Sequence, residues 1–144
     1  MAVADLIRSR QQVFSIPEEM TVHEAARYLR EKQIRSVGVK NAAGKLTGVV
    51  SQADISDRVA AENKCPAWMR VAEIMSTDLV SVTPEMSEHE CLLTMEKHGI
   101  YHLLVVDAKE KYLGMISVSD LLKLIASDHK ERADLLESFV FPQR

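Results

Sequence analysis

The sequence predicts an α+β protein built from two copies of one unit, each with the order strand, helix, strand, strand, helix. A gapless offset of 66 residues aligns 15–55 with 81–121 and gives 12 identical pairs in 41 positions, where ordinary composition gives about two or three. Each copy also carries a helix-capping motif and ends its last strand in Gly-x-x-Ser-x-x-Asp. One copy is too short to enclose a core. We therefore expect two repeats related by pseudo-two-fold symmetry, with their sheets packed together and the helices outside.

Length and composition favour a soluble globular protein. The chain has 144 residues, of which 47% are hydrophobic and 27% charged. A net charge of −3 argues against binding to a nucleic-acid backbone, and no apolar run is long enough to cross a bilayer. Cys65 and Cys91 are too few for a disulfide framework and fit no zinc spacing. We expect a cytoplasmic protein without nucleic-acid, membrane or metal partners.

The first elements follow from apolar spacing. Apolar residues at helical spacing predict a lead-in helix over 2–11, and residues 71–75 repeat its pattern before the second copy. A short strand follows over 13–16 and is closed by Pro17, which cannot donate to a ladder.

The helix after this strand begins with a capping box in both copies. Thr21 and Glu24 form it in the first copy, Ser87 and Glu90 in the second, and each N-cap contributes about 1 kcal/mol. Gly99 suits the left-handed position that ends the second copy of this helix. The residues expected to be buried are Val22, Ala25, Ala26 and Leu29 in the first helix and Cys91, Leu92 and Met95 in the second.

Two strands and a second helix complete each copy. The strands are predicted over 37–39, 46–50, 103–106 and 112–116, and the helices start near Asp54 and Asp120. The chain then divides into a first repeat with its lead-in helix over 1–62, a linker over 63–70, a second repeat over 71–127 and a helical C-terminal tail over 128–144.

The duplicated order, the Val105-Val106-Asp107 strand and turn, and the Gly-x-x-Ser-x-x-Asp ends at 48–54 and 114–120 resemble the CBS domain (cystathionine β-synthase domain). A tandem pair of these domains is also called a Bateman module. The resemblance covers the chain apart from the linker and the tail. It implies a non-catalytic regulatory module without a cofactor, which binds adenosine-containing ligands such as AMP, ADP, ATP, NAD or S-adenosylmethionine in clefts between the repeats. It also implies a homodimer formed through the repeat helices, and signal transduction to a partner protein.

The same resemblance implies which residues bind the ligand. Asp54 and Asp120 would accept hydrogen bonds from the ribose hydroxyls, with Ser51 and Ser117 beside them in the ribose and phosphate region. A carboxylate suits this task because it accepts two adjacent donors in charge-assisted hydrogen bonds. The phosphate contacts would be Arg35 and His102. The adenine slot would be lined by Ile16, Ile34 and Val37 in the first copy and by Val82, Ile100, Tyr101 and Leu103 in the second.

Two departures from the family pattern predict unequal sites. The basic residue that often follows the apolar opening of the second strand is Arg35 in the first copy, but Tyr101 takes its place in the second, with His102 next. The second copy should favour a less anionic ligand or stack its tyrosine on a base. The family also often has proline where Gly38 and Leu104 stand, which changes the shape of the slot.

Plainer interpretations remain open for several of these residues. Ser-x-x-Asp at a strand-to-helix junction is a common N-cap, and capping does not exclude ribose binding because a carboxylate has several lone-pair sites. Arg35 also fits a surface arginine that packs its stem along the sheet. Trp68 is predicted to pack within the linker, with base stacking as the alternative. The alternative function is a ligand-free dimerisation module, and a small enzyme ranks third because the sequence offers no nucleophile–base pair.

The helix after Asp120 is apolar on more than one face. Leu121 and Ile125 share one stripe and Leu122 points elsewhere, so one side should pack on its own sheet and the other on a partner. Residues 135–139 carry a further apolar stripe, which would extend that interface or fold back over a cleft.

Overall fold

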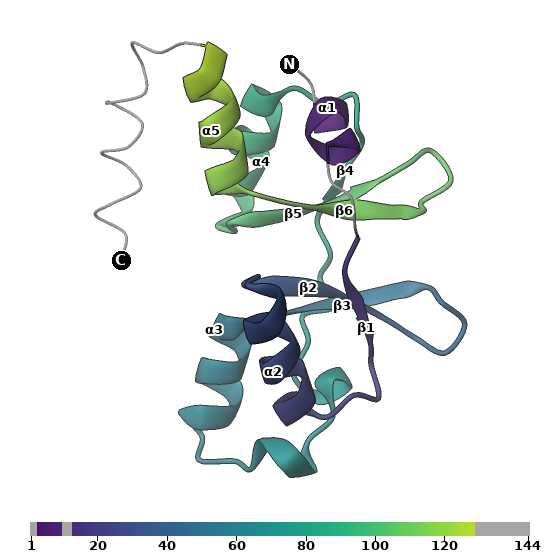
Figure 1. Cartoon of the computed structure of the whole chain (residues 1–144), viewed down its shortest axis with the longest axis vertical. Coiled ribbons are helices and arrows are strands. Elements are labelled where there is room, and N and C mark those ends of the chain that lie inside the picture. Colours follow the sequence, from purple (N-terminus) through teal and green to yellow (C-terminus); the bar gives the residue numbers. More distant parts are fainter. Residues whose placement is uncertain (1–2, 10–12, 129–144) are drawn as a thin grey trace. The chain divides into compact units, whose positions relative to one another are not determined.

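The structure is a computed structural model that describes residues 3–9 and 13–128 (Figure 1). The described residues form two compact units, one of residues 13–80 and one of residues 3–9 with 81–128. Each unit combines helices with one three-stranded sheet, which confirms the α+β fold class. None of the described helices is long and apolar enough to span a membrane. The predicted C-terminal tail lies, beyond residue 128, outside the described residues.

The unit of residues 13–80 contains the whole first strand–helix–strand–strand–helix pattern. β1 pairs in parallel with β2, and β2 pairs antiparallel with β3. The helices lie on one face of this sheet (Figure 1). Its elements are β1 (Ser15–Pro17), α2 (Val22–Lys32), β2 (Ser36–Lys40), β3 (Leu46–Ser51), α3 (Gln52–Ile55), the π-helical segment η1 (Ser56–Ala60) and the 3₁₀ turns η2 (Pro66–Trp68) and η3 (Val71–Glu73).

The predicted capping box fixes the start of α2. The Glu24 backbone N–H donates to Thr21 Oγ1 at 3.1 Å, and the Thr21 N–H donates to Glu24 Oε1 at 3.3 Å. Gln33 ends the helix in the left-handed conformation, with φ of 57°. Three of the four predicted inward residues are buried and Ala26 is half-buried. The core beneath the sheet contains Ile16, Val22, Ala25, Leu29, Val37, Val39, Val50, Val59, Val71 and Ile74.

The second unit repeats this pattern. Ser87 caps α4 by accepting from the Glu90 N–H at 3.1 Å, and Gly99 ends the helix at φ of 64° as predicted. The predicted capping box is only half formed, because Glu90 Oε1 accepts from the Ser87 hydroxyl instead of the Ser87 N–H. Cys91 and Met95 are buried on its inner face, and Leu92 is half-buried. The elements are α1 (Val3–Arg8), β4 (Ser81–Val82), α4 (Glu88–His98), β5 (His102–Val106), β6 (Tyr112–Ser117) and α5 (Val118–Asp128).

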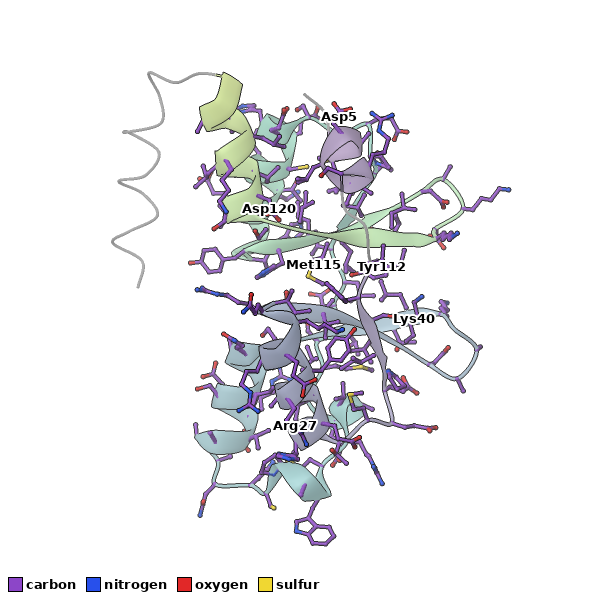
Figure 2. All side chains as sticks on the ribbon, in the orientation of Figure 1. Asp5, Arg27, Lys40, Tyr112, Met115 and Asp120 are labelled. Carbon is purple, nitrogen blue, oxygen red and sulfur yellow. The ribbon has the colours of Figure 1, made fainter. Side chains whose placement is uncertain are left out.

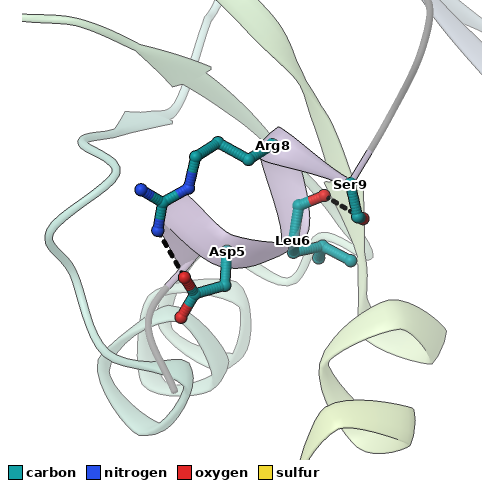
Figure 3. Close-up of polar contacts among 4 residues, drawn as sticks. All are labelled: Asp5, Leu6, Arg8 and Ser9. Carbon is teal, nitrogen blue, oxygen red and sulfur yellow. Dashed lines mark hydrogen bonds and ion pairs between the residues drawn. The ribbon is translucent and has the colours of Figure 1, made fainter.

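The lead-in segments pack on the sheet of the opposite repeat. In α1, Val3 is fully buried and the Ala4 N–H donates to the Pro84 carbonyl at 2.9 Å. Its outer surface is polar: Arg8 donates to Asp5 (Figure 3). The segment that begins at Val71 instead joins the core of residues 13–80, so each compact unit contains pieces of both repeats.

Two local expectations were wrong. The second lead-in segment is a single 3₁₀ turn rather than a helix, because Val71 and Ile74, three residues apart, both face the core. Trp68 does not pack in the linker: it is 86% exposed, and Met69 is the neighbouring residue that contacts the core.

Candidate functional site

The first Ser-x-x-Asp segment lies where β3 ends and α3 begins. The Ser51 N–H and Oγ both donate to Asp54 Oδ2, at 2.8 and 3.0 Å, and the Asp54 N–H donates to Ser51 Oγ at 3.1 Å. This is a complete capping box, so the plain capping interpretation is confirmed. The box uses only Oδ2 of Asp54, and Oδ1 of this half-buried carboxylate stands outside it.

The second segment repeats both backbone hydrogen bonds of this box between β6 and α5. The Ser117 N–H donates to Asp120 Oδ2 at 2.9 Å, and the Asp120 N–H donates to Ser117 Oγ at 3.1 Å. Figure 2 shows Asp120 at the first turn of α5, where its side chain is also half-buried. The duplication therefore extends from the sequence to the hydrogen bonds around both carboxylates.

Strand pairing brings the predicted phosphate contacts to the same sheet ends. Ser51 lies opposite Ser36 at the start of β2, and Ser117 lies opposite His102 at the start of β5. The residue before each of these strands is tied to the helix that follows the box: the Gln52 N–H donates to the Arg35 carbonyl at 2.9 Å. The matching bond runs from Val118 to the Tyr101 carbonyl at 3.0 Å. Equivalent backbone bonds thus tie Arg35 and Tyr101 to the residue that follows the serine of each box.

The predicted adenine-slot residues divide into buried and accessible ones. Ile34 and Ile100 are half-buried at the entrances to β2 and β5, and Tyr101 is 60% exposed. Among the predicted adenine-slot residues, these three are therefore the ones with side-chain surface that a ligand could contact. The remaining members are at most 3% exposed and pack beneath the sheet ends: Ile16, Val37, Val82 and Leu103.

An aromatic cluster at the same end of the first sheet was missed in the sequence. Phe14, just before β1, meets Tyr28 edge to face at a centroid distance of 6.3 Å. The Lys32 ammonium lies 5.6 Å from the Phe14 ring centroid and 5.8 Å from that of Tyr28. Burial raises the pKa of the Tyr28 phenol, which keeps it neutral. The available signal was the four-residue spacing of Tyr28 and Lys32, which places both on one helix face.

The cysteines lie in opposite environments. Cys91 is fully buried, and burial, with smaller contributions from Glu90 and Glu88, raises the pKa of its thiol to about 11. Such a thiol is protonated at neutral pH and is a poor nucleophile. Cys65 is exposed. Over residues 3–9 and 13–128, no three His, Cys, Asp or Glu side chains gather as metal ligands would.

Comparison with known families decides the classification. Two segments, residues 3–61 and 71–127, match the model of the CBS domain. The chain belongs to the CBS-domain family. The matched segments follow the duplication, and each ends beyond its Ser-x-x-Asp box, which confirms the recognised tandem CBS pair.

The curated relatives of this chain differ in length. The protein MJ1232 of Methanocaldococcus jannaschii is 29% identical over 121 residues, which are 84% of this chain and 39% of that protein. A homoserine O-acetyltransferase of Methanococcoides burtonii is 32% identical over 124 residues, 86% of this chain and 24% of the enzyme. The CBS domain-containing protein YhcV of Bacillus subtilis is 31% identical over 110 residues, 76% of each chain. The CBS pair thus spans well under half of the first two relatives.

Solved structures share the fold of the CBS pair. A CBS-domain protein from Burkholderia ambifaria matches with a TM-score of 0.83 at 27% identity, over 90% of this chain and 96% of its own. The pair of protein MJ0100, in complex with 5′-methylthioadenosine and S-adenosylmethionine, matches at 0.78 and 22% identity, over 89% and 98%. PAE2072 from Pyrobaculum aerophilum, complexed with AMP, matches at 0.76 and 22%, over 83% and 89%.

Proposed function

We propose that this CBS pair is a non-catalytic regulatory module that binds adenosine-containing ligands at its two Ser-x-x-Asp sheet ends. The observation that carries the proposal is the repeated state of the carboxylates. Each accepts the serine N–H through Oδ2 and is half-buried, and Oδ1 of Asp54 stands outside its capping box. A carboxylate held in this way is preorganised to accept from two neighbouring hydroxyls, as a ribose presents them.

The surroundings of the boxes supply the other parts of an adenosine site. Ile34 and Ile100 offer apolar surface for a base, and Arg35 offers a permanent charge for a phosphate. Other proteins of this fold were solved with AMP, 5′-methylthioadenosine or S-adenosylmethionine, which supports adenosine as the shared ligand component. Regulation follows if the ligand binds two arrangements of the module with different affinity, because only such a difference shifts their populations.

A thermal-shift screen tests the proposal. Purified chain is heated with AMP, ADP, ATP, NAD, S-adenosylmethionine or 5′-methylthioadenosine, with a pyrimidine nucleotide as the matched control. At about 100 times its dissociation constant a ligand stabilises the fold by about 2.7 kcal/mol. The proposal expects a rise in melting temperature for at least one adenosine compound and none for the pyrimidine. The proposal is rejected if no adenosine compound raises the melting temperature at millimolar concentration.

A ligand-free dimerisation module is the second candidate, because apolar side chains stay accessible on α4 and α5. Leu93 is 51% exposed, and Leu122 and Ile125 are half-buried while Leu121 is fully buried. We propose that this two-sided helix pair forms a homodimer, which is compatible with either function. Sedimentation of Leu93→Glu would show a monomer if this surface is the interface, and an unchanged mass would place the interface elsewhere.

A further inference from the structure

The helix that follows the first Ser-x-x-Asp box differs from its counterpart in the second unit. Only Gln52–Ile55 is α-helical, and the next five residues, Ser56–Ala60, form the π-helical segment η1. The Ala61 N–H closes this wide turn on the Ser56 carbonyl at 2.8 Å. The matched helix α5 is α-helical over its whole length, Val118–Asp128. A π-turn inside a helix is rare and is often found at functional positions, so the difference points to a role that belongs to the first copy alone.

Arg58 in this π-turn bonds to the second lead-in segment, residues 71–76. Its Nη1 donates to the Ile74 carbonyl at 3.2 Å. The adjacent Val59 is 2% exposed and Ile74 is 1% exposed, and both belong to the core of this unit. The guanidinium therefore joins two stretches of backbone that core packing already holds. The offset of 66 residues places Leu124 where Arg58 stands, and a leucine side chain has no donor for such a bond.

Hydrogen bonds close a ring between the capping box and this lead-in segment. On one side, Arg58 lies four residues after Asp54 on the same helix, and its guanidinium reaches Ile74. On the other side, Ser76 exchanges backbone hydrogen bonds of 2.8 and 2.9 Å with Val49, which stands in β3 two residues before the serine of the box. The box and the lead-in segment are thus joined twice, once through the helix and once through the strand.

Building on the proposed function, we propose that Arg58 couples the first adenosine site to the lead-in segment of residues 71–76. A ligand held by Asp54 fixes the first turn of the helix, and with it the position of Arg58 one turn further along. The bond to Ile74 then forms with a smaller loss of conformational freedom, so the ligand favours the closed ring. Arg58 is a positioning residue that does not touch the ligand.

Hydrogen exchange in the presence of adenosine tests this coupling. The full chain with Asp120→Asn is used, because its first site alone would bind. Saturating adenosine should slow amide exchange in residues 71–76 at least about fivefold more than in the turn of residues 41–45, which is the lower end of the usual coupling between sites. This turn joins β2 to β3 at the sheet end opposite the box, so it reports the general stabilisation of the unit by a bound ligand.

Arg58→Leu, which copies the matched position of the second unit, should abolish this extra protection. Because coupling between two sites is reciprocal, the same variant should weaken adenosine binding, measured by calorimetry, by the factor by which adenosine had slowed exchange. Arg58→Lys keeps a donor and should retain part of both effects. Arg27→Leu is the matched control, since Arg27 is an exposed helix arginine that pairs with Glu31 at 3.6 Å outside the ring, and it should change neither quantity.

The outcomes separate this inference from the proposed function. Adenosine binding without extra protection of residues 71–76 would overturn the coupling and keep the adenosine sites. Exchange that becomes faster in Arg58→Leu by the same factor with and without adenosine, at unchanged affinity, would show that the Arg58–Ile74 bond only supports the fold, and would also overturn the coupling. Absence of adenosine binding in the parent chain would remove both proposals.

Discussion

Asp54 and Asp120 cap the helices that follow them, and we propose the same carboxylates as the ribose contacts. Oδ2 of each accepts from the backbone of the serine three residues earlier, a bond set by local chain geometry. The sequence therefore predicted these contacts correctly, since an N-cap needs only a few consecutive residues. The exposure of Trp68 and the Phe14–Tyr28–Lys32 cluster were not predictable in the same way, because they depend on residues distant along the chain.

The two cysteines should differ sharply in reactivity. Cys65 is exposed, while Cys91 is buried with its thiol pKa raised to about 11. At pH 8 a disulfide reagent should modify one thiol per native chain quickly and the second only on the timescale of unfolding. Cys65→Ser removes the fast phase and serves as the control. Rapid modification of Cys91 in that variant would contradict its assigned burial.

The same burial gives a pH dependence in alkaline solution. The unfolded thiol ionises at its ordinary pKa of 9.0, and the folded one at about 11. Because the folded pKa is raised, the unfolded chain releases the proton first, so this contribution to stability is intact below pH 9 and is lost between pH 9 and 11. Urea titrations of the parent chain and Cys91→Ala should show a shallower decline in the variant, and equal declines would refute this origin.

Helices and strands were predictable where a local signal sets their ends. The capping residues Thr21 and Ser87 and the left-handed Gly99 stand where the helices begin and end. The exchange of lead-in segments was not predicted, because it depends on pairing across the chain rather than on periodicity. The exchanged lead-in segments pack against equivalent glycines of the two sheets. A Cβ on Gly48 would meet Met75, and one on Gly114 would meet Ile7.

Thr21→Ala should destabilise the fold by about 1 kcal/mol, the usual effect of losing an N-cap. The hydrogen bonds from Thr21 lower the pKa of Glu24, so the part of the box that the Glu24 carboxylate contributes is present at neutral pH and is lost as the pH falls through the folded pKa of Glu24, while the bond from the Glu24 N–H to Thr21 Oγ1 remains. Urea unfolding at pH 7 and in acid should show the difference between variant and parent shrinking in acid. A difference independent of pH would show that the Glu24 carboxylate takes no part.

Gly48→Ala should destabilise the unit of residues 13–80 by about 1–3 kcal/mol through overpacking. Its Cβ would stand 2.5 Å from Met75 Sδ and 3.0 Å from the Ser76 carbonyl oxygen. Met75→Ala should recover part of this loss in a double-mutant cycle, with a coupling of at least about 0.5 kcal/mol. Additive effects would show that the lead-in segment does not rest on Gly48.

At the scale of the whole molecule, the sequence repeats and the compact units have different boundaries. Residues 3–9 belong with 81–128, and residues 71–80 with the first sheet. The duplicated fold was predictable because both copies keep the same pattern, whereas the sheet-to-sheet packing and the homodimer remain predictions. The regulated partner is a further proposal, since the chain spans only 39% of MJ1232 and 24% of the acetyltransferase that it resembles.

Calorimetric stoichiometry with adenosine tests the central proposal most directly, since adenosine carries only the base and the ribose that both proposed sites would bind. The parent chain should bind two equivalents, Asp54→Asn and Asp120→Asn one each, and the double variant none. Asparagine keeps an oxygen for the capping box, and Glu24→Gln changes a box outside both sites as the matched control. Adenosine binding that survives in the double variant would contradict the assignment of these carboxylates as the ribose contacts.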